Sequence, residues 1–263
     1  MKINFTKMHG LGNDFVIINN LDKNIELSAK RIQTLADRHR GIGFDQLLMV
    51  EPSSQKECDF SYRIFNADGS EVEQCGNGAR CFAKFVRDQG LTSKDKLIVS
   101  TKTGRLRLHF VGDEVQVEVG IPKIELPLVL TLSGYSQSFQ RISIGNPHAV
   151  LLVKDVNQTP VAEWGTQVTR DKHFPAGTNV EFMQIEDCSH IRLRVYERGV
   201  GETLACGSGA CAAVVAGQSL KQLDKTVFVQ LPGGELKVDW LGEDKPIWLA
   251  GPAVKVFEGW LIG

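Results

Sequence analysis

Apolar residues follow two rhythms along the chain, which together predict a mixture of helices and strands. Residues 28–39 place Ile32 and Leu35 at helical spacing after Ser28, a residue type that commonly caps a helix N-terminus. Residues 97–119 instead contain runs with an apolar side chain at every second position, which is typical of half-buried strands. Glycine-rich turns separate these segments, so the sequence predicts an α+β fold.

One segment of the chain occurs twice. EQCGNGARCFAKF, residues 73–85, has its counterpart in LACGSGACAAVV, residues 204–215. Each copy places a cysteine, Cys75 or Cys206, directly before Gly-x-Gly-Ala and an apolar helical pattern. A cysteine in that position is expected at a helix N-terminus, where unpaired N–H groups and the helix dipole favour the thiolate. Two such motifs suggest a pair of thiols that act on one substrate.

The repeat extends over most of the chain. ISIGNPHAVLLV matches GLGNDFVII, GTNVEFMQIE resembles GIGFDQLLMVE, and RVYERGVGETLACGSGA aligns without a gap on RIFNADGSEVEQCGNGA. Matching positions stay 130 to 133 residues apart. The sequence therefore predicts two pseudo-symmetric α/β halves, residues 1–122 and 123–263, each a sheet around a central helix. The active site is expected in a cleft between them.

Two segments fall outside the repeat. Residues 123–138, with Pro127 and Gly134, are expected to form a loop that contains the boundary between the halves. Residues 253–263 are apolar and follow the end of the second copy. They are expected to form a strand that packs back on the first half, because their side chains need cover.

Composition excludes several classes of protein. The chain has 263 residues and a net charge of −1, so neither nucleic acid nor an anionic membrane is an expected partner. The N-terminal residues lack the apolar core of a signal peptide, and no apolar run is long enough to span a bilayer. Six cysteines in such a chain are expected to be reduced thiols. We therefore expect a soluble cytoplasmic protein.

Paired thiols on either side of one carbon can invert a stereocentre. A thiolate removes a proton from one face, and a thiol delivers another proton to the opposite face. Two thiols in one closed site do not both ionise, because like charges raise the second pKa. The pair therefore holds one proton, which is the state that a two-base epimerase requires.

The polar residues of the repeated motifs suit an amino-acid ligand. Backbone N–H groups at Gly76-Asn77 and Gly207-Ser208 can bind a carboxylate at two helix N-termini. Four asparagines at strand–turn junctions can hold ammonium or carboxylate groups: Asn13, Asn66, Asn146 and Asn179. Glu197-Arg198 can bind a second ammonium and carboxylate, whereas the first half has Asn66-Ala67 at that place. This asymmetry favours a substrate whose two ends have different roles.

The segments MHGLGNDF, NADGSEVEQCGNGAR, IGNPHAV, GTNVEF and YERGVGETLACGSGACA together closely resemble the diaminopimelate epimerase family. The resemblance covers nearly the whole chain. It implies a cofactor-independent isomerase that interconverts LL- and meso-2,6-diaminopimelate in lysine and peptidoglycan-precursor synthesis. It also implies a homodimer, although a tyrosine often found at the family's interface is replaced here by Phe257.

The same resemblance implies roles for individual residues. Cys75 and Cys206 would be the acid/base pair, and His148 and Glu197 would tune the thiols. The substrate-binding residues would be Asn13, Gln46, Asn66, Gly76, Asn77, Asn146, Asn179, Glu197, Arg198, Gly207 and Ser208. No metal and no organic cofactor is implied.

Two alternative functions remain open on sequence alone. One is a related isomerase on the same scaffold, such as a proline racemase, in which a ligand with a single carboxylate would leave Glu197-Arg198 unmatched. The other is an amino-acid-binding protein without catalytic activity, whose cysteines only cap helices.

Several residues are expected to have structural roles. Cys58, Cys81, Cys188 and Cys211 are interpreted as small buried hydrophobic residues. Asp45 and Glu181 are interpreted as partners of backbone groups, and His9 as either a structural or a site residue. Neither the cysteine spacing nor the histidines indicate a zinc site.

Overall fold

The computed structural model describes residues 2–72, 76–102, 104–112 and 114–262. The described chain is mostly β-strand with few helices, and it forms two compact units. The first unit comprises Met1–Val117 and Gly251–Gly263, and the second comprises Glu118–Ala250. Among the described residues, no helix has both the length and the apolar composition that crossing a membrane would require.

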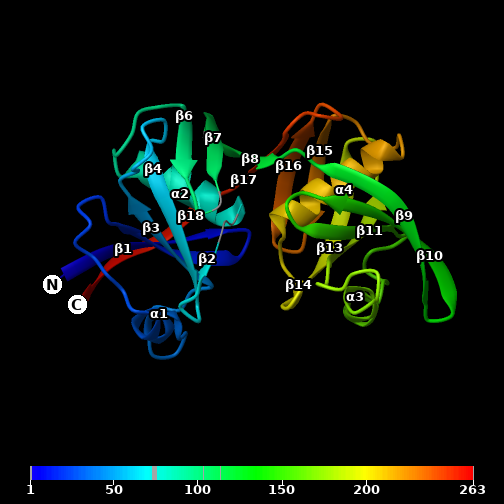
Figure 1. Cartoon of the computed structure of the whole chain (residues 1–263), viewed down its shortest axis with the longest axis horizontal. Coiled ribbons are helices and arrows are strands. Elements are labelled where there is room, and N and C mark those ends of the chain that lie inside the picture. Colours follow the sequence, from blue (N-terminus) through cyan, green and yellow to red (C-terminus); the bar gives the residue numbers. More distant parts are fainter. Residues whose placement is uncertain (1, 73–75, 103, 113, 263) are drawn as a thin grey trace. The chain divides into compact units, whose positions relative to one another are not determined.

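Among its described residues, the first unit contains one continuous set of paired strands and two helices (Figure 1). Its strands pair in the order β18-β1-β2-β3-β4-β6-β7-β8, and the short β5 pairs with β4. The β2–β3 and β4–β6 pairs are parallel. Its elements are β1 Lys2–Gly10, β2 Asn13–Asn19, α1 Ala29–Ala36, β3 Gln46–Glu51, β4 Phe60–Asn66, β5 Glu71–Val72, α2 Gly76–Asp88, β6 Lys96–Ser100, β7 Arg105–Val111, β8 Glu114–Gly120 and β18 Val254–Ile262.

The second unit repeats this connectivity. Its strands pair in the order β9-β10-β11-β12-β13-β15-β16-β17, and β14 pairs with β13. The β11–β12 and β13–β15 pairs are parallel. Its elements are β9 Lys123–Leu132, β10 Tyr135–Ser143, β11 Pro147–Leu152, α3 Val161–Thr169, β12 Asn179–Ile185, β13 His190–Glu197, β14 Gly201–Thr203, α4 Gly207–Ser219, β15 Thr226–Leu231, β16 Gly234–Trp240 and β17 Ile247–Gly251.

The prediction of a loop at residues 123–138 is wrong. Lys123–Leu132 forms β9, which pairs antiparallel with β10 from Tyr135 onward. A proline has no backbone N–H to donate, so it is tolerated only where a strand has an unpaired side. Pro127 is tolerated in β9 because the pairing described for this strand is with β10, on one side. In the second unit, β9 therefore occupies the place that β18 occupies in the first.

The chain's C-terminal segment completes the first unit. Figure 1 shows β18, in red, beside β1, in blue, with the chain's N- and C-terminal ends at the same side of this unit. Pairing runs from Lys2 opposite Ile262 to His9 opposite Val254. This pairing covers the backbone of β1, but most large apolar side chains of β18 stay exposed, among them Val256, Phe257 and Trp260.

The two main helices pack against strands for different reasons of sequence. α2 buries Phe82, Phe85 and Val86 in one core with side chains of β1–β4 and β6–β8. The rings of Phe82 and Tyr62 pack edge to face, with their centroids 4.9 Å apart. α4 consists mainly of alanine, valine and glycine and is buried on nearly all sides. Its small side chains allow the strands β10–β13 and β16 to approach closely.

We expect Gly69→Ala to destabilise the first unit more than Gly90→Ala. Both glycines have left-handed backbones, with φ of +80° and +66°, so alanine is strained at either position by about 1 kcal/mol. Only at Gly69 does an added Cβ clash, at 2.6 Å from the Cα of Ala29 at the start of α1. The total loss should be about 2 to 4 kcal/mol for Gly69→Ala. Urea unfolding followed by circular dichroism measures both, and equal losses would contradict the steric argument.

Candidate functional site

The parallel pairs place the candidate residues at corresponding ends of the strands in each unit. In the first unit, Asn13 begins β2 and Gln46 begins β3, while Asn66 ends the antiparallel neighbour β4 opposite Gln46. In the second unit, Asn179 begins β12 and Glu197 ends β13. The helices α2 and α4 begin at Gly76 and Gly207, and Ser208 and Asn77 lie in their first turns. Cys75 lies outside the described residues.

Two amide pairs form in the first unit. Gln46 Nε2 donates to Asn66 Oδ1 at 2.9 Å, and Asn77 Nδ2 donates to Asn13 Oδ1 at 3.3 Å. Gln46 Oε1 is buried and has no hydrogen-bond partner among the residues that the structure describes. Asn77 itself is held by Arg80, whose Nη2 donates to Asn77 Oδ1 at 3.0 Å. The structure thus links Asn13 to Asn77 and Gln46 to Asn66, each pair through one hydrogen bond.

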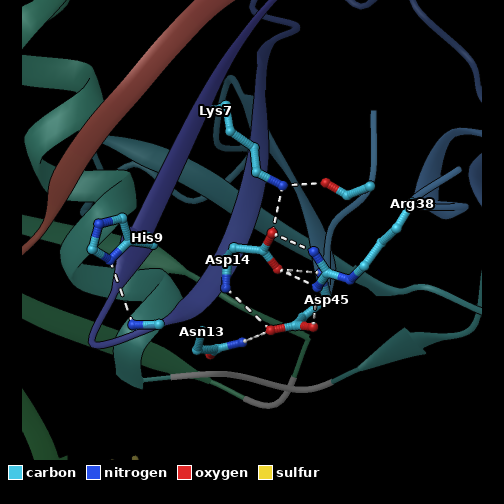
Figure 2. Close-up of polar contacts among 8 residues, drawn as sticks. Lys7, His9, Asn13, Asp14, Arg38 and Asp45 are labelled. Atoms are coloured by element: carbon cyan, nitrogen blue, oxygen red, sulfur yellow. Dashed lines mark hydrogen bonds and ion pairs between the residues drawn. The ribbon is translucent and has the colours of Figure 1, made fainter. Parts of the chain in front are cut away.

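An ion network supports Asn13 (Figure 2). Asp14 accepts hydrogen bonds from Arg38 at 2.8 and 2.9 Å and from Lys7 at 2.6 Å. Burial alone would raise the pKa of Asp14, but the hydrogen bonds from Arg38 and Lys7 outweigh it and lower that pKa to about 2. Asp45 accepts from Arg38, from the backbone N–H of Asp14 and from Asn13 Nδ2, the last at 2.9 Å. The network therefore fixes both the backbone after Asn13 and its amide.

Asp45 thus meets a backbone group, as the sequence indicated, and binds two side chains as well. His9 accepts a hydrogen bond at Nδ1 from the backbone N–H of Gly12 at 3.4 Å, in the turn before Asn13 (Figure 2). This contact gives His9 a structural role in the turn before Asn13.

Glu197 and Arg198 are adjacent in sequence but have separate partners. Glu197 Oε1 accepts from the hydroxyl of Thr203 at 2.5 Å. The backbone N–H of Arg198 donates to Asn179 Oδ1 at 2.9 Å, and its Nη1 donates to the carbonyl of Ala176 at 3.1 Å. Arg198 is exposed, so its guanidinium has access to a ligand while one of its nitrogens stays anchored.

Cys206 is the N-cap of α4, as its motif predicted, but its thiol is buried. Burial raises the pKa of Cys206 well above its ordinary value, and the carboxylates of Glu197 and Glu181 raise it further. The N–H of Gly209 and the hydroxyl of Ser208, whose oxygen lies 3.6 Å from the sulfur, act in the opposite direction with less effect. Burial and the two carboxylates thus oppose the effect of the helix terminus, and the direction of the pKa shift favours the protonated thiol at Cys206.

Sequence reasoning missed Glu181. Its carboxylate is fully buried, and besides a hydrogen bond with its own backbone N–H, it makes a side-chain contact that was not expected, with Oε1 2.7 Å from Nδ1 of His148. His148 is also buried, and its Nε2 lies 3.0 Å from Asn146 Oδ1. An added Cβ at Gly209 would lie 2.9 Å from Glu181 Oε1, so this glycine lets the carboxylate approach α4. Strand alternation was the available signal, because Asn179 and Glu181 must face the same side of β12.

The remaining cysteines divide into two groups. Cys81 and Cys211 are buried in α2 and α4, which confirms their interpretation as small core residues. Cys188 is exposed and Cys58 is only half-buried, so the same interpretation is wrong for Cys188. No group of three potential metal-binding side chains occurs in the part of the chain that the structure describes.

A pocket of about 150 Å³ lies in the second unit. Its lining includes His148, Pro147, Ala176 and Gly177. It therefore borders His148 itself and also Ala176, whose carbonyl accepts a hydrogen bond from Arg198.

Comparison with known proteins identifies relatives over the whole chain. The family model for diaminopimelate epimerase matches residues 5–125 and 141–256. A phenazine biosynthesis protein of the PhzF family from Bacillus anthracis has a TM-score of 0.76 at 19% identity, covering 100% of this chain and 99% of that chain. A hydroxyproline epimerase from Agrobacterium vitis, with bound trans-4-hydroxy-L-proline, has a TM-score of 0.70 at 13% identity, covering 99% of this chain and 92% of that chain. A probable proline racemase from Agrobacterium radiobacter K84 has a TM-score of 0.72 at 14% identity, covering 99% of this chain and 93% of that chain. These structures share the fold of this chain.

We expect Asp14→Asn to lower stability at neutral pH but not in acid. The pKa of Asp14 is about 2 in the folded protein against an ordinary value of 3.8, so its stabilisation is fully present above about pH 4 and is lost as the pH falls towards 2. Allowing for screening by solvent at the half-exposed Arg38, the loss at pH 7 should be about 1 to 2 kcal/mol. Urea unfolding of both proteins at neutral and acidic pH measures it. If the difference in unfolding free energy between the parent protein and Asp14→Asn stayed constant with pH, the lowered pKa of Asp14 would be contradicted.

Proposed function

The chain belongs to the diaminopimelate epimerase family, and on that premise we propose that it interconverts LL- and meso-2,6-diaminopimelate without a cofactor. The observation that carries the proposal is the family match, which runs through both cysteine motifs and both units. The proposal includes the cytoplasm as its location and lysine and peptidoglycan-precursor synthesis as its role.

In the proposed mechanism, Cys75 and Cys206 are the two acid/base groups. One thiolate removes the α-proton of the substrate, and the thiol on the opposite face delivers a proton to the resulting carbanion. The raised pKa of Cys206 supports its acting as the acid from the state described here, which leaves Cys75 as the base in that direction. Each turnover exchanges the protonation states of the two sulfurs, so the reverse reaction begins from the opposite state.

The remaining candidate residues are proposed to bind the substrate. The N–H groups at the starts of α2 and α4, from Gly76, Asn77, Gly207 and Ser208, would bind the carboxylate next to the reacting carbon, where they also stabilise its developing negative charge. Glu197 and Arg198 would bind the ammonium and carboxylate of the other end. The amide side chains that complete the site are those of Asn13, Gln46, Asn66, Asn146 and Asn179.

The proline racemase alternative is disfavoured by one difference between the units. The first unit ends β4 with the neutral Asn66, whereas the second ends β13 with Glu197 and continues with the exposed Arg198. A substrate with one carboxylate and one amine would leave these charges without a partner. Diaminopimelate has a second amino-acid group that matches them.

We also propose that the protein forms a homodimer. The exposed apolar residues of β18, including Phe257 at 46% exposure, form an unusual surface on an edge strand. A second copy of the chain that covered β18 would bury them.

The direct test is incorporation of deuterium from D2O into LL-diaminopimelate by the purified protein. We expect labelling of the α-position without added cofactor, and we expect Cys75→Ala and Cys206→Ala each to abolish it. Cys188→Ala is the matched control, because Cys188 is exposed and remote from both motifs in the sequence, and it should leave the rate unchanged. A wild-type protein that labelled proline but not diaminopimelate would establish the racemase instead, and one that labelled neither would favour the binding protein.

We expect Arg198→Met to lower kcat/KM for diaminopimelate by about 30-fold or more. Removing one partner of a desolvated charge-assisted contact costs about 2 to 5 kcal/mol, and lysine should recover only part of the loss because it lacks the planar fork of arginine. Steady-state kinetics of Arg198→Met and Arg198→Lys measure the effect. Values within a few-fold of the parent would remove Arg198 from the proposed site.

A further inference from the structure

The two units differ at one buried pair of side chains beside their equivalent asparagines. In the second unit, His148 and Glu181 lie on the adjacent strands β11 and β12, where His148 pairs with Asn179 and Val150 with Glu181. The same registers in the first unit place Phe15 opposite Gln46 and Ile17 opposite Leu48. Phe15 and Leu48 are completely buried and apolar. The scaffold therefore folds with an apolar pair here, and the histidine and carboxylate have a role other than packing.

The number of protons on this pair follows from its burial. Both side chains are inaccessible to solvent, and Glu181 Oε2 has no hydrogen-bond partner among the described residues. A net negative charge in such a place is strongly disfavoured, and Glu197 nearby disfavours it further. Desolvation accordingly raises the pKa of Glu181. Burial and the 2.7 Å contact favour one proton between Glu181 Oε1 and His148 Nδ1, and the acceptor Asn146 Oδ1 at 3.0 Å favours a second proton on His148 Nε2.

That second proton fixes the direction of the next hydrogen bond. His148 Nε2 lies 3.0 Å from Asn146 Oδ1, so the imidazole donates and the amide oxygen accepts. The amide –NH2 of Asn146 then points away from His148. Asn146 is half-buried at the start of β11, so this group has access to a ligand.

Asn13, the equivalent residue of the first unit, is held in the opposite way. Its –NH2 donates to the carboxylate of Asp45 at 2.9 Å, and its Oδ1 accepts from Asn77 at 3.3 Å. The amide nitrogen of Asn13 is thus bound by a carboxylate and its oxygen by Asn77, whereas the contact of Asn146 with His148 is made through its amide oxygen. The two units therefore hold their equivalent asparagines in different ways.

We propose that Glu181 is a positioning residue, which holds His148 so that Asn146 presents its –NH2 to a carboxylate of the substrate. This inference rests on the proposed function for the identity of the substrate, but not for the hydrogen-bond chain. Glu181 does not touch the substrate and acts only through His148.

The first test needs no substrate. In the free protein labelled with 15N-histidine, we expect Nε2 of His148 to carry a proton at neutral pH, and we expect this signature to be lost in Glu181→Leu. His148→Phe assigns the resonance. An unprotonated Nε2 in the parent protein would overturn the proposal whatever the enzyme's activity.

The second test uses kinetics on whichever amino acid the parent protein labels with deuterium. The double variant His148→Phe/Glu181→Leu copies the apolar pair of the first unit, so it should fold with a melting temperature close to that of the parent. We expect its kcat/KM to fall by about 10- to 100-fold, mainly through KM, because Asn146 loses its anchor. Glu181→Gln should lose less than about tenfold, because its amide can donate to Nδ1 and leave the proton on Nε2. A folded double variant with kcat/KM within about threefold of the parent would overturn the proposal.

Substitution of Asn146 tests the direction of its amide. If the –NH2 meets a carboxylate, Asn146→Asp must lower kcat/KM more than Asn146→Ala does, because in Asn146→Asp a second oxygen faces the anion. The opposite order would show that Asn146 presents its oxygen to a cation and would overturn the proposal. Failure of the proposed function is distinguishable, since it would appear as the absence of label in diaminopimelate with the imidazole signature intact.

Discussion

Parallel pairing of β2 with β3, and of β11 with β12, is the constraint on which the candidate site depends. Parallel neighbours must begin at the same edge of a sheet, and each therefore needs a crossover connection, which contains α1 or α3. The antiparallel strands β4 and β13 end at that same edge, and the helices α2 and α4 begin shortly after them. Polar strand ends and unpaired helix N–H groups consequently gather in one place in each unit.

Local signals in the sequence predicted the elements that have strong local causes. Ser28 caps α1 by accepting from the N–H of Arg31 at 3.2 Å, and α2 and α4 begin directly at the glycines of the two motifs. The helix α3 was missed, because Pro160 gives no side-chain cap and Gly165 is a poor helix former. Gly165 is explained only by tertiary structure, since an added Cβ would lie 2.3 Å from the ring of Tyr196. The sequence predicts a loop in place of β9 for a similar reason, because the proline of this strand is acceptable only at an edge.

The places of the candidate residues in the fold were predictable from the sequence, but the electrostatics around them were not. Motif position alone indicated that Cys206 would meet the favourable end of a helix dipole. It could not indicate that burial and two carboxylates would outweigh that dipole, because Glu181 lies 25 positions earlier in the sequence and acts through space. The hydrogen bonds between Asn13, Asp45 and Arg38 likewise join residues from three separate segments. Electrostatics that arise from such long-range neighbours require coordinates.

The origin of β18 also affects how the chain is made. The second unit is built from one continuous stretch, Glu118–Ala250, whereas the first needs β18, which follows that stretch in the chain. During translation, the first unit therefore waits with the edge of β1 unpaired while the unit encoded after it can already close. Open strand edges of this kind are the usual sites of mispairing between nascent chains. The first unit can therefore be completed only after the residues of the second unit have been synthesised.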